Sequence, residues 1–151
     1  MRRLFTPFVN GGDVAPLVLF ATSIALWVTA LFRPAFVQKA SGLTQYTGLN
    51  CLLLGWFGLF GVFRWGLPWL ANVAYAVSLL GALVRRPGGK YALIASLAAI
   101  PLALVTYANK TIAVDEAGNE VAVTIGIAFY LWLAAMVVAA FAHLVAAMRK
   151  A

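Results

Sequence analysis

The charged side chains of this chain are spaced so that they leave five long intervals without a charge. The chain has eleven Lys and Arg residues, four Asp and Glu residues and one histidine. A helix needs about 20 apolar residues to cross a hydrocarbon core of about 30 Å. The pattern therefore predicts an all-α membrane protein that crosses the bilayer several times. The charge-free intervals are residues 14–32, 40–63, 65–84, 91–109 and 121–148.

The composition agrees with a membrane protein. Hydrophobic residues make up 64% and charged residues 10% of the 151 residues, against about 45–50% and 25% in soluble domains. We expect one integral membrane domain over residues 1–151, with the lipid bilayer as its partner. The net charge of +7 is interpreted as cations flanking the spans and not as a nucleic-acid surface, because the basic residues form no dense run. Cys51 is the only cysteine, so the chain forms no internal disulfide.

The first charge-free interval is predicted to be an uncleaved anchor. Arg2 and Arg3 precede it, as in a removable signal sequence. However, Pro7 interrupts the approach to the apolar run, and Arg33 follows Phe32 where a small-residue cleavage site would be needed.

Cations in short loops predict the orientation. A short loop at residues 85–90 contains three of them, and two more end the chain. Such loops stay on the cytoplasmic side. The connection at residues 109–124 carries three acidic residues and one cation, and is predicted to be external. The residues concerned are Arg85, Arg86, Lys90, Arg149 and Lys150 on the cytoplasmic side, and Lys110, Asp115, Glu116 and Glu120 on the external side.

The interval 40–63 leaves two span counts open. Polar residues trim its apolar part to residues 49–63, about 22 Å of helix, and three glycines weaken that helix by about 1 kcal/mol each. This favours four transmembrane helices plus one short or re-entrant segment. Five spans stay the alternative, because non-helical backbone at membrane depth must be covered by protein or face a wet cavity. The glycines, Gly55, Gly58 and Gly61, are candidates for close helix packing or for lining a pore in an oligomer.

Two further patterns predict local structure. The β-branched runs 111–114 and 121–124 flank a Gly-containing turn, which predicts a small external β-hairpin. Helices at 91–108 and 125–148 carry small residues at matching intervals and are predicted to pack as antiparallel neighbours. The stripes are Ala92, Ser96, Ala99 and Ala103 on one helix, and Ala135, Ala139, Ala142 and Ala146 on the other.

Few polar residues are expected at membrane depth. Asn72 is the most notable of them, because it lies between Trp69 and Tyr75 on a predicted helix. Interhelical hydrogen bonding is the favoured role, and lining a pathway is the alternative. His143 is interpreted as an interfacial or packing histidine; as a haem or metal ligand it would need a second copy of the chain. The other members of the set are Asn50, Ser78, Ser96 and Thr106.

The missing carboxylates exclude several function classes. Proton-coupled transporters use Asp, Glu or His inside the bundle, and the predicted spans contain no acidic residue. Hydrolysis would need a nucleophile with a base or a pair of carboxylates. We therefore expect no enzyme activity, no catalytic residues, no cofactor and no metal site.

Two stretches resemble known proteins. Trp69-Leu70-Ala71-Asn72 and the Gly-x-x-Phe-Tyr-x-Trp-x-Ala segment at residues 126–134 are similar to stretches of small uncharacterised bacterial multi-pass inner-membrane proteins. The resemblance covers about a fifth of the chain. It implies a location in the bacterial inner membrane, with the C-terminus cytoplasmic, and carries no activity with it.

These observations lead to one leading function and one alternative. The expected function is that of a non-enzymatic accessory, scaffold or immunity-type membrane protein, which acts through helix packing with itself or with a membrane partner. The alternative is a small oligomeric channel or facilitative transporter.

Overall fold

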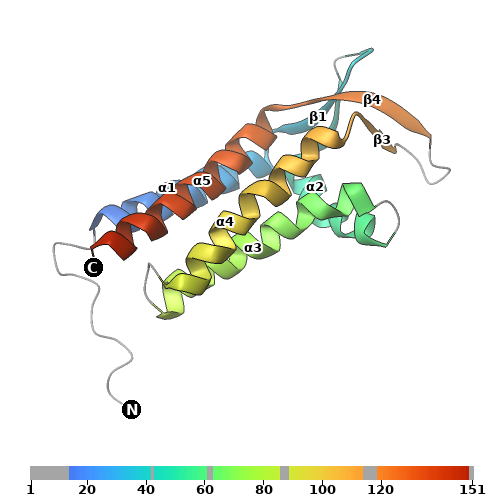
Figure 1. Ribbon diagram of the computed structural model, residues 1–151. Helices are drawn as coiled ribbons and strands as arrows, with labels where there is room; N and C mark the ends of the chain where they lie inside the picture. The colour runs from blue at the N-terminus through green and yellow to red at the C-terminus, as the bar shows by residue number, and fades with distance from the viewer. Residues whose placement is uncertain (1–13, 42, 61–62, 86–88, 114–118, 150–151) are drawn as a thin grey trace.

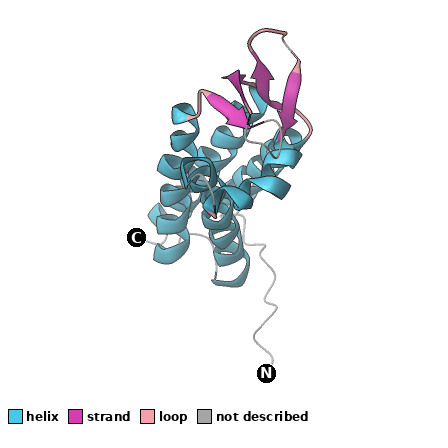
Figure 2. Ribbon diagram, turned by 90° about the vertical axis from the view of Figure 1, so that its right-hand side faces the viewer, coloured by secondary structure: helices cyan, strands magenta, loops and turns pink. Residues whose placement is uncertain are grey.

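The computed structural model describes residues 14–41, 43–60, 63–85, 89–113 and 119–149. Most of these residues are helical, and a small curled sheet lies at one end of the helices (Figure 1, Figure 2). Four of the helices are long and apolar enough to cross a membrane. The structure is therefore compatible with the expected membrane bundle.

The long helices run back and forth along the bundle (Figure 1). They are α1 (Val14–Leu31), α3 (Phe63–Arg85), α4 (Lys90–Leu104) and α5 (Ile127–Met148). The 3₁₀ turn η2 (Val105–Ala108) continues α4. With 18 residues, helix α1 covers about 27 Å. We call the end near the sheet the sheet end and the end where α5 finishes the C-terminal end.

Within the interval 40–63, whose span count the sequence left open, the chain forms a short, broken helix at the sheet end. Helix α2 (Gly48–Leu54) has seven residues and turns into the 3₁₀ helix η1 (Gly55–Leu59) of five. The Thr47 hydroxyl caps α2 by accepting a hydrogen bond from the Asn50 N–H at 3.3 Å, which is the usual role of Thr at this position. Both helices together are too short to span. Within the described ranges, the four-span interpretation is supported and the five-span alternative is not.

The predicted hairpin is present but belongs to a larger sheet. Strands β3 (Thr111–Ala113) and β4 (Glu120–Ile125) pair antiparallel, with Ile112 opposite Val121. Residue 114, also assigned to the hairpin, lies outside the described residues. Strands β1 (Pro34–Gln38) and β2 (Thr44–Thr47) complete the sheet in the order β2-β1-β4-β3. A hairpin alone is marginal in water, and β1 provides the edge that supports it.

The sequence pattern does not predict strands β1 and β2. Residues 34–47 begin with a proline and contain a polar stretch, so they show no clear alternation of apolar and polar residues. Their pairing depends on contact with a distant segment. The Gly126 N–H donates to the Ala35 carbonyl at 2.8 Å, and a Cβ at Gly126 would lie 2.3 Å from the Pro34 carbonyl oxygen. Glycine is therefore required where α5 leaves the sheet.

Small residues line the contacts between helices. All eight residues of the two predicted stripes are buried, and α4 contacts α5 as predicted. The most extensive contacts, however, join α3 with α4 and α1 with α5. A Cβ at Gly81 would lie 2.7 Å from the Cβ of Ala92, so α3 and α4 approach as closely as glycine allows.

Helices α1 and α5 meet along residues spaced by seven. Pro16, Ser23 and Ala30 are the buried residues of α1, and Ala128, Ala135 and Ala142 lie buried on α5. A spacing of seven keeps one face of each helix turned to its neighbour. The Ser23 hydroxyl donates to the Ala135 carbonyl at 2.7 Å and fixes the two helices in register.

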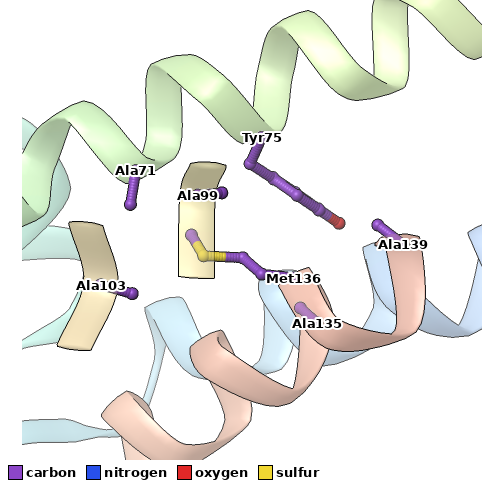
Figure 3. Packing of buried hydrophobic residues seen from close by; sticks show 7 residues of the cluster. All are labelled: Ala71, Tyr75, Ala99, Ala103, Ala135, Met136 and Ala139. Carbon is purple, nitrogen blue, oxygen red and sulfur yellow. The ribbon is translucent and has the colours of Figure 1, made fainter. Parts of the chain in front are cut away.

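A compact core joins α3, α4 and α5. Figure 3 shows Tyr75 extending from α3 towards α5, and Met136 extending from α5 towards Ala99. Met136, Ala99 and Ala139 are fully buried. One flexible side chain therefore fills the space that the surrounding alanines leave.

We expect Ala99→Leu to destabilise the bundle. Ala99 is fully buried, and added methylenes in a packed core cost about 1–3 kcal/mol. Ala98→Leu is the matched control, because Ala98 is the neighbouring residue and is exposed. Thermal unfolding in detergent should show a lower midpoint for the first variant and an unchanged one for the second. Equal midpoints for both variants would contradict the packing described.

Candidate functional site

A cavity of about 460 Å³ lies at the sheet end of the bundle. Residues from α1, α3 and α5, from η2 and from the sheet line it, and α2 and η1 close part of its side. On the sheet side, Ala35 and Ile112 are buried. On the α2–η1 side, Leu54 and Phe57 are 49% and 56% exposed. The volume is in the range of small-molecule sites, about 300–1,000 Å³.

Aromatic side chains dominate the wall of the cavity. Trp27, Trp69 and Trp132 come from α1, α3 and α5. None of the described residues that line the cavity is charged. The site is therefore suited to an apolar occupant. The other aromatic residues in the lining are Phe36, Tyr46, Phe57 and Phe129.

Asn72 is held in the cavity wall by two tryptophans. Its Oδ1 accepts hydrogen bonds from Trp132 Nε1 at 2.8 Å and from Trp27 Nε1 at 3.2 Å. Because an indole N–H can only donate, these two bonds fix which end of the amide is the oxygen. The Nδ2 donors of Asn72 meet no acceptor among the described residues. Asn72 therefore joins α1, α3 and α5 and keeps donor capacity at the cavity.

Thr106 supplies a second polar group. It lies in η2, lines the cavity and is only 6% exposed. Its hydroxyl has no hydrogen-bond partner within the described part of the chain. An unsatisfied buried hydroxyl costs about 1–3 kcal/mol. An occupant that bonded to Thr106 would recover that free energy.

Cys51 lines the cavity from α2. Burial raises the pKa of its thiol from 9.0 to about 12, because desolvation disfavours the thiolate. The described residues around the cavity include no histidine, lysine or carboxylate that could activate the thiol. Since the thiolate is the nucleophile, Cys51 is a poor one.

Between the cavity and the C-terminal end, polar side chains form hydrogen bonds between helices. Tyr75 and Ser23 share a hydrogen bond of 2.6 Å between their hydroxyls. Further towards the C-terminal end, the Ser78 hydroxyl lies 2.9 Å from His143 Nε2. Each of these bonds crosses between helices, as expected where lipid offers no alternative partner.

His143 lies in the packed interior. It is fully buried, and its ring meets the edge of Phe20 with centroids 4.8 Å apart. In the described segments, no group of three or more His, Cys, Asp and Glu residues could hold a metal ion. The structure therefore places His143 in helix packing away from the bundle surface.

The predicted glycine run lies against α3. Gly55 faces the Trp69 ring, and a Cβ there would lie 3.0 Å from Trp69 Cδ1. A Cβ at Gly66 would lie 2.6 Å from the Gly58 carbonyl carbon. The Trp69 indole also donates to the Leu52 carbonyl at 2.8 Å. Gly61 lies outside the described residues.

Of the remaining polar candidates, one lies at the cavity and one does not. Ser96 is buried and donates to the Leu93 carbonyl of its own helix at 2.8 Å. Asn50 is exposed at the edge of the cavity and accepts a hydrogen bond from Thr47. The structure thus brings Asn50, Asn72 and Thr106 to one cavity and leaves Ser96 apart from it.

The cavity itself was not predicted from the sequence. Trp27 is not singled out from the sequence, and Trp132 enters only as part of the stretch at residues 126–134; both lie near the sheet end of their helices, as Trp69 does. A tryptophan at similar depth on three spans is the signal that points to them. By itself it is also typical of an interfacial aromatic belt.

Comparisons of this chain with protein-family models, with curated proteins and with solved structures found no match. The function is therefore argued from the geometry of the cavity and of the helix contacts.

We expect alkylation of Cys51 by iodoacetamide to accelerate about tenfold per pH unit between pH 7 and pH 10. A thiol with a pKa of about 12 stays protonated throughout this range, so its thiolate fraction keeps rising. The measurement is the initial labelling rate in detergent by mass spectrometry. The same chain unfolded in SDS is the control, and its rate should level off above pH 9. A plateau near pH 9 in the folded protein would contradict the burial of the thiol.

Proposed function

We propose that this protein is a non-enzymatic accessory component of the bacterial inner membrane, of the scaffold or immunity type. It works by binding, and its packed helices form the frame that holds the cavity open. The observation that carries the proposal is the cavity at the sheet end, which is walled by aromatic side chains and uncharged in its described lining. Such a site offers binding energy but no acid, base or activated nucleophile.

The packed interior of the bundle also supports this proposal. Ser23, Tyr75, Ser78 and His143 are engaged in hydrogen bonds between helices. They hold the bundle together and are not arranged around the cavity. A rigid frame with one open end suits a protein that presents a binding site to the membrane or to a partner protein.

A small oligomeric channel or facilitative transporter is the second candidate. The cavity and the glycines beside it favour this alternative. Against it, fully buried Met136, Ser78 and His143 fill the bundle between the cavity and the C-terminal end. A path through a single copy of the chain would have to displace them.

For the orientation, we propose that the sheet end is external and the C-terminal end cytoplasmic. The start of α1, the end of α3, the start of α4 and the end of α5 lie at one end of the bundle (Figure 1). In the sequence, seven of the eleven Lys and Arg residues precede α1, fall within residues 85–90 or follow α5, and cations in such positions remain on the cytoplasmic side.

Cysteine labelling in intact cells tests the orientation. In a Cys51→Ser background, Asn119→Cys at the sheet end should react with a membrane-impermeant maleimide, because Asn119 is exposed on the side proposed to be external. Met148→Cys, which is also exposed, should react only after the cells are opened. The reverse pattern would overturn the orientation.

Reconstitution into liposomes separates binding from conduction. We expect purified protein to add no K⁺ or proton flux to that of empty liposomes, because the C-terminal half of the bundle is filled by buried side chains. Gramicidin provides the positive control. Flux that scales with protein content, and that falls in a Met136→Trp variant, would favour the channel instead.

A further inference from the structure

We propose that the cavity binds a neutral, carbonyl-bearing lipophile that enters from the bilayer. This inference rests on the proposed binding function and adds the chemical class of the ligand. The shared chemistry is an uncharged carbonyl oxygen attached to an apolar body. An acyl ester and a lipid-soluble quinone are two sources of it.

Two of the polar side chains that line the cavity can donate a hydrogen bond to an occupant. Asn72 uses its oxygen on the two tryptophans and keeps its Nδ2 donors unused among the described residues. Thr106 carries a hydroxyl that is buried and has no hydrogen-bond partner among the residues that the structure describes. Both groups can donate. A carbonyl oxygen can accept from either of them, whereas a pure hydrocarbon would leave both unsatisfied.

The same wall selects against a charged ligand. No Lys, Arg or His stands among the described residues that line the cavity. Taking a carboxylate or a phosphate into such a site, with no opposite charge to meet it, would cost more than two hydrogen bonds return. The recognised oxygen is therefore neutral, and a charged headgroup would have to stay outside the cavity.

The exposed side of the cavity faces the direction from which a lipid would come. Leu54 and Phe57 line the cavity and are about half exposed, whereas Ala35 and Ile112 on the sheet side are buried. An entrance bordered by exposed apolar side chains at the level of the helix ends lies where the bilayer interface meets the protein.

Protection of Cys51 provides a reporter inside the site. It is the only cysteine in the chain and lines the cavity, so an occupant should slow its alkylation. The protein in dodecyl maltoside micelles, a detergent without carbonyl groups, would be treated at pH 9 with iodoacetamide in the presence of methyl laurate, dodecane or laurate. A fully substituted decyl benzoquinone forms the fourth arm, because its ring cannot add to the thiol.

We expect methyl laurate or the quinone to protect Cys51 at a concentration about 3–10-fold lower than dodecane does, as one or two hydrogen bonds would give. Laurate should protect least. The more effective of the two carbonyl compounds identifies the source. Equal protection by the ester, the quinone and dodecane would overturn carbonyl recognition but keep the cavity as a binding site. No protection by any of the four would contradict the proposed binding function itself.

Two variants separate recognition from stability. Thr106→Val removes only the unpartnered hydroxyl, so it should keep or raise thermal stability while the advantage of the carbonyl compounds over dodecane falls by at least threefold. Asn72→Leu should reduce the same advantage, although it also leaves two indoles without an acceptor. Thr29→Val is the control, because the Thr29 hydroxyl bonds to the Ala25 carbonyl of its own helix. An undiminished advantage in both cavity variants would refute the proposal.

Discussion

Four helices that are long and apolar enough to cross a bilayer leave their polar groups few hydrogen-bond partners, and this scarcity governs the structure. A polar group on a spanning helix must find its partner on another helix or within its own, since lipid supplies none. Ser23 forms hydrogen bonds with the Tyr75 hydroxyl and the Ala135 carbonyl. Ser78 forms one with His143. Such bonds need the helices to be close. The small residues on the contact faces let the helices approach closely. The hydrogen bonds between helices therefore depend on these small residues.

The two ends of the bundle contain different side chains: one end is closely packed and the other holds the cavity. Towards the C-terminal end, alanine, serine and one histidine bring the helices together and leave little space. Towards the sheet end, Trp27, Trp69 and Trp132 from three helices line the cavity. Asn72 fixes two of these rings through one oxygen. Hydrogen bonds within the wall of the cavity therefore hold its aromatic side chains in place.

The sequence predicts the parts of the structure that follow from local patterns. Charge-free intervals predict four long helices, and the glycines with the polar residues before them predict that 40–63 is short and broken. The stripes through Ala99 and Ala139 predict buried faces, which the structure confirms. The sheet pairing of β1 with β4 and the convergence of three tryptophans depend on contacts between segments 42 to 105 residues apart. Such contacts leave no periodic signal in a single sequence.

The sheet explains how a cavity can persist next to a bilayer. Without it, the ends of α1, α3 and α5 around the cavity would be free to close on one another and remove the empty space, because voids forfeit dispersion contacts. Strand β1 follows α1 directly and pairs with β4, which leads into α5. Gly126 brings that junction into contact with Pro34 and Ala35. The sheet therefore joins α1 and α5 at the end of the bundle where the cavity lies.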